Sequence, residues 1–254
     1  MRLGLHALGI GAGADRRVID AVAVAAQDNG FATLWAGEHV VMVDRSDSRY
    51  PYSEDGRITV PARADWLDPL MCLGFAAAAT TTIGIATGVL LLPEHNPLLV
   101  AKQAASLDHL SGGRLTLGVG IGWSRAEFDA LGVPFARRAT PCASPRRTPR
   151  FVVGGNSDAA LRRIVAWGDG WYGFYVEDVE GRVELLRRLC RDAGRDPAAL
   201  QLAVALREPQ VADVQRLAGI GVDELVLVQT PPGDAAAVPG WMATLADRWI
   251  PALS

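Results

Sequence analysis

Residues 151–174 read FVVGGNSDAALRRIVAWGDGWYGF, and this stretch holds one complete strand–helix–strand unit. The apolar run Phe151–Val153 predicts a strand, and Gly170–Phe174 predicts a second one. Between them, Asp158–Trp167 is expected to form a helix. Strands that alternate with helices pair in parallel through right-handed crossovers. The stretch therefore predicts a parallel α/β fold.

The same alternation extends over the whole chain, whose 254 residues divide into eight such units of about 32 residues each. The expected strands are Arg2–Leu8, Thr33–Ala36, Ile83–Leu92, Leu115–Gly120, Phe151–Val153, Gly170–Phe174, Leu202–Leu206 and Glu224–Val228. Eight units most simply close into a (β/α)8 TIM barrel, and a doubly wound open sheet is the alternative. Because no composition shift or linker divides the chain, residues 1–254 are expected to form a single domain.

Composition excludes several classes of protein. Half of the residues are hydrophobic and the formal net charge is −3, which argues against disorder and predicts no nucleic-acid partner. Cys72, Cys142 and Cys190 are too few and too scattered for a disulfide framework or a CxxC metal site, so no metal is expected. Met1–Gly13 lacks a secretory signal pattern, and Met71–Thr82 is too short to span a bilayer. We therefore expect a cytoplasmic protein with no membrane partner.

One unit of the pattern is defective. Pro141, Pro145 and Pro149 follow the expected short helix Ser124–Leu131, and each proline lacks the amide donor that a helix needs. The crossover that follows the strand Leu115–Gly120 is therefore expected to be truncated.

The segment Arg137–Arg150 of this unit has five arginines and no acidic residue. A solvated basic loop is the common explanation. The alternative is that Arg146 and Arg147 help to screen an anionic ligand tail.

Active sites of barrels lie at the C-terminal ends of the strands, and Glu38 and His39 directly follow the strand Thr33–Ala36. A carboxylate beside an imidazole suits general acid–base chemistry, because histidine titrates near neutral pH. A surface dipeptide is an equally good interpretation.

Glycine marks the ends of two further strands. Gly88, inside the strand Ile83–Leu92, indicates a bulge, a close approach of a ligand or a tight packing contact. The run from Gly118 to Trp123 is not a dinucleotide fingerprint, because the glycine that the pattern requires three residues after its second glycine is replaced by Trp123 or Arg125. Trp123 could stack on a ring or cover the barrel mouth.

Two more turns precede helices. Gly154, Gly155, Asn156 and Ser157 lie where free amides at a helix N-terminus could bind an anion, and a simple capped turn is the alternative. His95 and Asn96 are expected to shape a turn and to cap the helix that begins at Pro97.

These runs together resemble the luciferase-like monooxygenase superfamily, and most closely its branch that uses the deazaflavin coenzyme F420. The tyrosine- and proline-rich loop Arg49–Pro61 also resembles that branch. The runs that carry the resemblance are Leu34–Val41, Thr87–Pro97, Leu107–Arg114, Leu117–Trp123, Val152–Ser157 and Asp169–Trp171.

The resemblance implies a (β/α)8 barrel with the cofactor at its C-terminal mouth and a bulged, often cis, peptide at Gly88–Val89 behind the ring. It implies that Glu38 and His39 lie near the redox face, as catalytic residues. The residues implied to bind the cofactor are Thr87, Gly88, Val89, Gly120, Trp123, Gly154, Gly155, Asn156 and Ser157.

Two departures from the family matter. Trp123 stands where some F420-dependent members carry a glutamate, and Ile121 where flavin-using luciferases carry an arginine. Acid–base duty is therefore expected to rest on His39, oriented by Glu38. The truncated crossover also makes this a shortened member.

Three functions follow from the resemblance. The first is an F420-dependent oxidoreductase that transfers a hydride to or from a small-molecule substrate. The second is an FMN-dependent monooxygenase that uses reduced flavin and oxygen, and the third is a non-catalytic member that binds a flavin or a partner. A homodimer is expected, and the residues expected to line the pocket are Tyr172, Phe174, Tyr175, Arg207 and Gln229.

Overall fold

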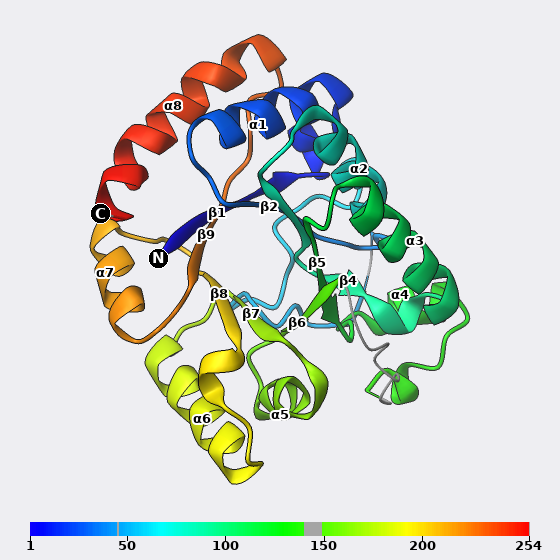
Figure 1. Ribbon diagram of the computed structural model, residues 1–254. Helices are drawn as coiled ribbons and strands as arrows, with labels where there is room; N and C mark the ends of the chain where they lie inside the picture. The colour runs from blue at the N-terminus through cyan, green and yellow to red at the C-terminus, as the bar shows by residue number, and fades with distance from the viewer. Residues whose placement is uncertain (45, 140–148, 254) are drawn as a thin grey trace.

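The computed structural model describes residues 1–44, 46–139 and 149–253, which form a barrel of parallel strands surrounded by helices (Figure 1). The sheet runs in the order β3-β2-β1-β9-β8-β7-β6-β5-β4, and β3 also pairs with β5, which closes it. The strands are β1 Arg2–Leu8, β2 Thr33–Ala36, β3 Gly84–Thr87, β4 Leu90–Leu91, β5 Leu115–Gly120, β6 Arg150–Gly154, β7 Gly170–Phe174, β8 Gln201–Ala205 and β9 Glu224–Val228. The predicted (β/α)8 TIM barrel is confirmed, and the alternative of an open sheet is wrong.

The strand predicted as Ile83–Leu92 is not continuous. It divides into β3 and β4, and the peptide bond between Gly88 and Val89 is cis, as the resemblance implied. β3 pairs with β2 and β5, whereas β4 pairs with β5 alone. Gly88, whose amide still donates to the carbonyl of Ala36 at 2.7 Å, and Val89 therefore interrupt the strand at the C-terminal mouth of the barrel.

The helices lie on the outside of the barrel, and several begin where the sequence places a capping side chain. Asp15, Asn96 and Ser157 each accept a backbone amide of the first turn that follows. The helices are α1 Arg16–Asp28, α2 Pro69–Ala79, α3 Pro97–Leu110, α4 Arg125–Ala130, α5 Asp158–Trp167, α6 Val179–Asp192, α7 Val211–Gly219 and α8 Val238–Trp249.

The connection between β5 and β6 contains the short helix α4, of 6 residues, and the 3₁₀ helix Phe135–Arg137. The other barrel helices have 9 to 14 residues. Within the described part of this connection the crossover is thus short, as the sequence predicts. The expectation for Arg146 and Arg147 lies outside the described residues.

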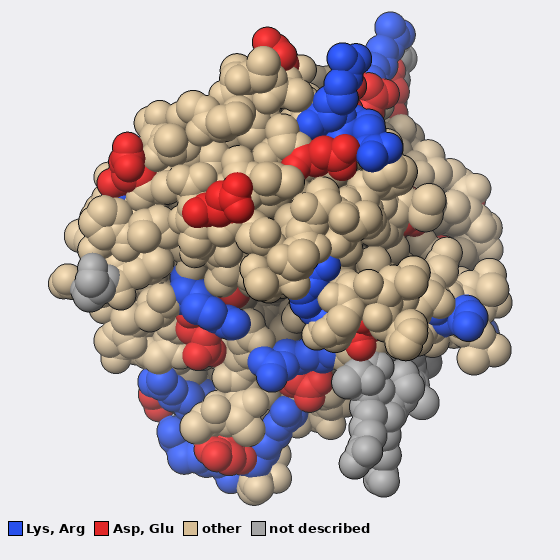
Figure 2. Space-filling view, turned by 45° about the horizontal axis from the view of Figure 1, so that its top comes forward, with Lys and Arg blue, Asp and Glu red and all other residues tan. Residues whose placement is uncertain are grey.

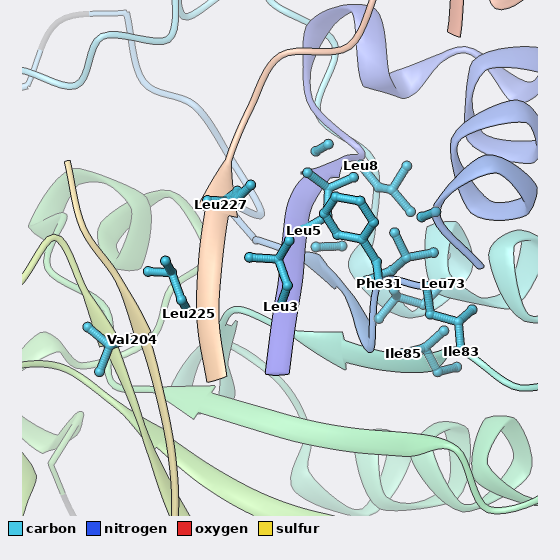
Figure 3. Packing of buried hydrophobic residues seen from close by; sticks show 14 of the residues in the cluster. Leu3, Leu5, Leu8, Phe31, Leu73, Ile83, Ile85, Val204, Leu225 and Leu227 are labelled. Atoms are coloured by element: carbon cyan, nitrogen blue, oxygen red, sulfur yellow. The ribbon is translucent and has the colours of Figure 1, made fainter. Parts of the chain in front are cut away.

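The larger apolar layer fills the space between the strands and the helices. Figure 3 shows Leu3, Leu5 and Leu8 of β1 beside Phe31 and Leu73, all of which are buried. Burial of such side chains is the main favourable contribution to folding.

A smaller apolar cluster fills the barrel interior. The ring of Trp35 stacks on that of Tyr172 with centroids 4.5 Å apart. Below this stack, the buried carboxyl group of Glu224 accepts from Nε1 of Trp35 at 2.8 Å and from Oγ1 of Thr33 at 3.2 Å. These side chains fill the N-terminal end of the interior, and the cavity described below lies above the stack.

Over the described residues, no helix is both long and apolar enough to cross a bilayer. On the face in Figure 2, Lys and Arg lie next to Asp and Glu rather than forming an extended area of one sign.

Candidate active site

A cavity of about 840 Å³ opens at the C-terminal ends of the strands. Its wall contains most of the residues that the sequence singled out: Glu38, His39, Gly88, Val89, Gly120, Trp123, Gly154, Gly155, Asn156 and Ser157. It also contains the expected pocket residues Tyr172, Phe174, Tyr175, Arg207 and Gln229. Thr87 is fully buried, and its hydroxyl donates to the carbonyl of Gly118 at 2.7 Å, so its side chain is committed to the sheet.

The His39 imidazole is held on three sides. Its Nδ1 lies 2.9 Å from Oε2 of Glu127, whose other oxygen accepts from the amide of Val41 at 3.1 Å. The rings of Trp66 and Trp123 meet it edge to face, with centroids 4.8 Å and 5.6 Å away. Because Nδ1 is paired with Glu127, Nε2 is the ring nitrogen that can interact with a ligand in the cavity.

The expectation that Glu38 orients His39 is wrong. Oε1 of Glu38 lies 3.0 Å from Nε2 of His95, and its Oε2 accepts from the amide of Leu91 at 2.5 Å. Although they are adjacent in sequence, Glu38 and His39 therefore reach different partners. His95 therefore does more than shape a turn, and its hydrogen bond to Glu38 raises its pKa.

Glu127 is the residue that sequence reasoning missed. Ser124 and Glu127 have the spacing of a helix-capping pair, which predicts only an N-terminal helix turn. Ser124 does cap α4, with its hydroxyl oxygen accepting the amide of Glu127 at 3.4 Å. The Glu127 carboxylate instead turns inward to His39, which only the fold could reveal.

Gly120 and Gly154, at the ends of two strands, leave room for the side chain of Val89. A Cβ atom on Gly120 would lie 2.6 Å from Cγ2 of Val89, and one on Gly154 would lie 2.7 Å from Cγ1. A Cβ on Gly88 would lie 3.1 Å from the Trp35 ring. Gly88 and Val89 thus form a ledge that rests on the aromatic stack and is wedged between the ends of β5 and β6.

The turn before α5 provides backbone donors more than side chains. Ser157 caps the helix by accepting from Ala160, and Nδ2 of Asn156 donates to the carbonyl of Phe174 at 2.8 Å. Gly155 has a φ of +107°, a conformation open to glycine. The side chains of this turn are largely used within the fold, so an anion here would meet backbone amides.

A cation that sequence reasoning did not identify lies beside this turn. Arg163 of α5 lines the cavity, and its buried Nε has no hydrogen-bond partner among the described residues. Burial, together with the nearby charge of Arg138, lowers the pKa of Arg163. Such a guanidinium is suited to a phosphate or carboxylate ligand.

An aromatic loop crosses the mouth of the cavity. Tyr50 packs edge to face on Trp123 at 5.2 Å, and Tyr52 packs on Phe174 at 5.4 Å. Arg207 donates to the carbonyl oxygen of Tyr52. Burial raises the pKa of both tyrosines, which therefore present neutral hydroxyl groups. The loop, which follows β2, thus contacts residues at or after the ends of β5, β7 and β8 and covers the mouth of the cavity.

The cavity floor holds a neutral histidine. Nδ1 of His6 lies 2.9 Å from the hydroxyl of Tyr172, and burial lowers the pKa of His6 to about 4. At neutral pH this pair can exchange hydrogen bonds with a ligand and carries no charge.

Comparison with known proteins gives consistent results. Residues 3–141 match the family model described as luciferase-like monooxygenase. An uncharacterized protein of Mycobacterium tuberculosis is 31% identical over 88% of this chain and 92% of its own length. The 4-hydroxyprotoasukamycin monooxygenase of Streptomyces nodosus is 30% identical over 89% of this chain and 54% of its own length. The coenzyme F420-dependent tetrahydromethanopterin reductase of Methanopyrus kandleri has a similar fold, with a TM-score of 0.67, 16% identity and coverage of 100% and 99% of the two chains.

Proposed function

The chain belongs to the luciferase-like monooxygenase family, and from this premise we propose that it is an oxidoreductase that transfers a hydride between coenzyme F420 and a small organic substrate. The observation that carries the proposal is the position of His39, fixed by Glu127, in the same cavity as the Gly88–Val89 ledge and the α5 turn.

The residues present fit a cofactor of the flavin type. The cavity of about 840 Å³ has room for a tricyclic ring with its side chain, and the ledge gives the ring a flat backbone surface. The amides at the start of α5 and the unpartnered Nε of Arg163 suit the phosphate. Gly88, Val89, Gly120 and Trp123 would hold the ring, and Gly154–Ser157 with Arg163 would hold the anionic end.

When bound, the deazaflavin supplies the hydride chemistry, and the chain supplies orientation, proton transfer and exclusion of water. His39 gives or takes the accompanying proton at Nε2, while Glu127 holds Nδ1. The loop that carries Tyr50 and Tyr52 covers the site and keeps water out.

The fold shared with the F420-dependent reductase and the resemblance of the loop Arg49–Pro61 support F420 as the cofactor. Titration of the protein with F420 and with FMN, each oxidised and reduced, tests this choice. We expect F420 to bind at least tenfold more tightly than FMN. Tight binding of FMN with no binding of F420 would contradict it.

An FMN-dependent monooxygenase is the second candidate, favoured by the similarity to 4-hydroxyprotoasukamycin monooxygenase over 89% of this chain. Oxygen uptake with reduced FMN but not with reduced F420 would identify it. Binding of either cofactor without turnover, over a panel of alcohols, ketones and enones, would instead identify a non-catalytic member.

A further inference from the structure

Glu94 is a buried acid that the proposed chemistry does not use. It ends the 3₁₀ helix Leu92–Glu94, directly after β4, and is 8% exposed. Both of its carboxyl oxygens are buried, and no N–H or O–H donor among the described residues reaches either one. The side chain that lies within hydrogen-bonding reach is the carboxyl group of Glu127. A Cβ atom on Gly122 would lie 2.9 Å from Oε1, so the glycine leaves the space that this carboxyl group fills.

Two other carboxyl groups face Glu94, from different elements. Glu127 comes from α4 and Glu38 from the segment after β2, and both repel a negative charge on Glu94. Each already has its own donors: Glu127 has His39 and the amide of Val41, and Glu38 has His95 and the amide of Leu91.

Of the three acids, Glu94 is therefore the one that carries a proton. An ionised carboxylate buried without a donor is strongly unfavourable, and adjacent carboxylates make it more so. Burial first, and then the charges of Glu127 and Glu38, raise the pKa of Glu94 to about 9. At neutral pH it is a neutral acid with one hydrogen to donate.

We propose that Glu94 is a positioning residue for His39: its neutral carboxyl group donates to the Glu127 carboxylate, which in turn holds Nδ1 of His39. The role in catalysis rests on the proposed function, since only there does His39 transfer a proton. The proposed hydrogen bond between Glu94 and Glu127 does not depend on the proposed function, because it is argued only from the cluster of buried acids.

The arrangement has a consequence at alkaline pH. When Glu94 loses its proton, a donor to Glu127 is replaced by a third negative charge in the same buried cluster. His39 then loses its fixed orientation, and turnover falls as pH rises through about 9. A glutamine at this position stays neutral, keeps a donor and has no such transition.

The test compares Glu94→Gln, Glu94→Ala and the surface control Glu184→Gln, whose side chain is 67% exposed. NMR of the ¹⁵N-labelled His39 ring, with no cofactor present, reports which nitrogen is protonated. We expect one tautomer at pH 7 in wild type, E184Q and E94Q, and a mixture in E94A. We expect an alkaline step in wild type and E184Q that is absent from E94Q.

Turnover gives the second readout. We expect kcat of E94Q within threefold of wild type at pH 7 and above it at pH 9.5, and kcat of E94A at least tenfold lower with KM unchanged. An alkaline step retained in E94Q, or a single His39 tautomer in folded E94A, would overturn the proposal. If neither F420 nor FMN binds, the proposed function fails, while the NMR result still decides the role of Glu94.

Discussion

Two adjacent residues, Glu38 and His39, follow the same strand but form hydrogen bonds with different side chains. Both residues line the cavity, but His39 is paired with Glu127, whereas Glu38 connects His95 to the backbone of Leu91. The first pair can act on a ligand, and the second fixes the chain that leads from the ledge into α3. Proximity in sequence therefore does not decide which side chains pair with each other.

Substitutions at His39, Glu127 and Glu38 should distinguish the residues that affect turnover from the one that affects stability. We expect His39→Ala to lower kcat about 10²- to 10⁴-fold, as for loss of a general acid or base. Glu127→Gln should lower kcat in the same direction with little change in KM, because the charge that orients the imidazole is lost. Glu38→Gln should mainly lower the midpoint of thermal unfolding. Single-turnover kinetics and calorimetry measure these effects, and a kcat loss in E38Q but not in E127Q would reverse the assignment.

Glu94 should also make folding stability depend on pH. Its folded pKa of about 9 lies above the ordinary glutamate value, so the folded state holds a proton that the unfolded state releases. This contribution is fully present below the unfolded pKa and is lost as pH rises through the folded one. The slope is at most about 1.4 kcal/mol per pH unit for one proton.

Chemical denaturation of wild type and Glu94→Gln between pH 5 and pH 9.5 measures this contribution. We expect the stability of wild type to decline relative to that of the variant as pH rises. Parallel curves would show that Glu94 is ionised in the folded protein.

At the scale of elements, the alternation of strands and helices was predictable because each unit carries its own signals. Asp15, Asn96 and Ser157 mark helix starts, and apolar runs mark strands, so most bounds agree within a residue or two. The break between β3 and β4 was foreshadowed by Gly88, which indicated a bulge among other possibilities, but the cis peptide at Gly88–Val89 came only from the resemblance.

The site was predictable where it depends on strand ends and unpredictable where it depends on long-range pairing. Glu38 and His39 follow a strand, so their place at the mouth follows from the fold. The partner of His39 is 88 residues away on α4, and no local pattern distinguishes it from a helix cap. Arg163 likewise lies within a helix pattern that gives no sign of a cavity.

The wedge of Val89 between two strand ends gives a test of the ledge. Gly154→Ala should destabilise the fold by about 1–3 kcal/mol, because the new methyl group collides with Cγ1 of Val89. Val89→Ala removes that methyl group, so the double variant should recover most of the loss. Gly240→Ala, which meets nothing within 4 Å, is the control. Denaturant unfolding measures the coupling, and strictly additive effects would show that Val89 is not the obstacle.

The proposed anion-binding end of the cavity lies at helix α5, and two adjacent arginines on that helix test it. Arg163 lines the cavity, and its neighbour Arg162 is exposed. Arg163→Gln should weaken cofactor binding about 10- to 100-fold, since a hydrogen bond to a charged group contributes about 1.5–3 kcal/mol. Arg162→Gln should change the Kd less than twofold. Equal effects of the two variants would mean that only general charge attraction is at work.

At the scale of the whole molecule, the largest exposed apolar side chains of the described residues gather on two neighbouring helices. Leu98, Leu99 and Leu110 of α3 are 80%, 64% and 82% exposed. Met71 of α2, the neighbouring helix on the ring (Figure 1), is 66% exposed. Exposed apolar patches of this kind mark interaction surfaces. We therefore expect a partner of this chain to bind on α2 and α3.

The expected homodimer should therefore form through α2 and α3, because a twofold interface brings the same patch of both copies together. Light scattering should give twice the chain mass of 27.0 kDa for wild type. Leu98→Asp with Leu110→Asp should give the single mass with an unchanged circular dichroism spectrum, since these side chains contribute little to the core. Val24→Asp, at an exposed site on α1, should leave the dimer intact. A monomeric wild type would contradict the expected homodimer. A dimer that survives the double substitution would show that the interface lies elsewhere.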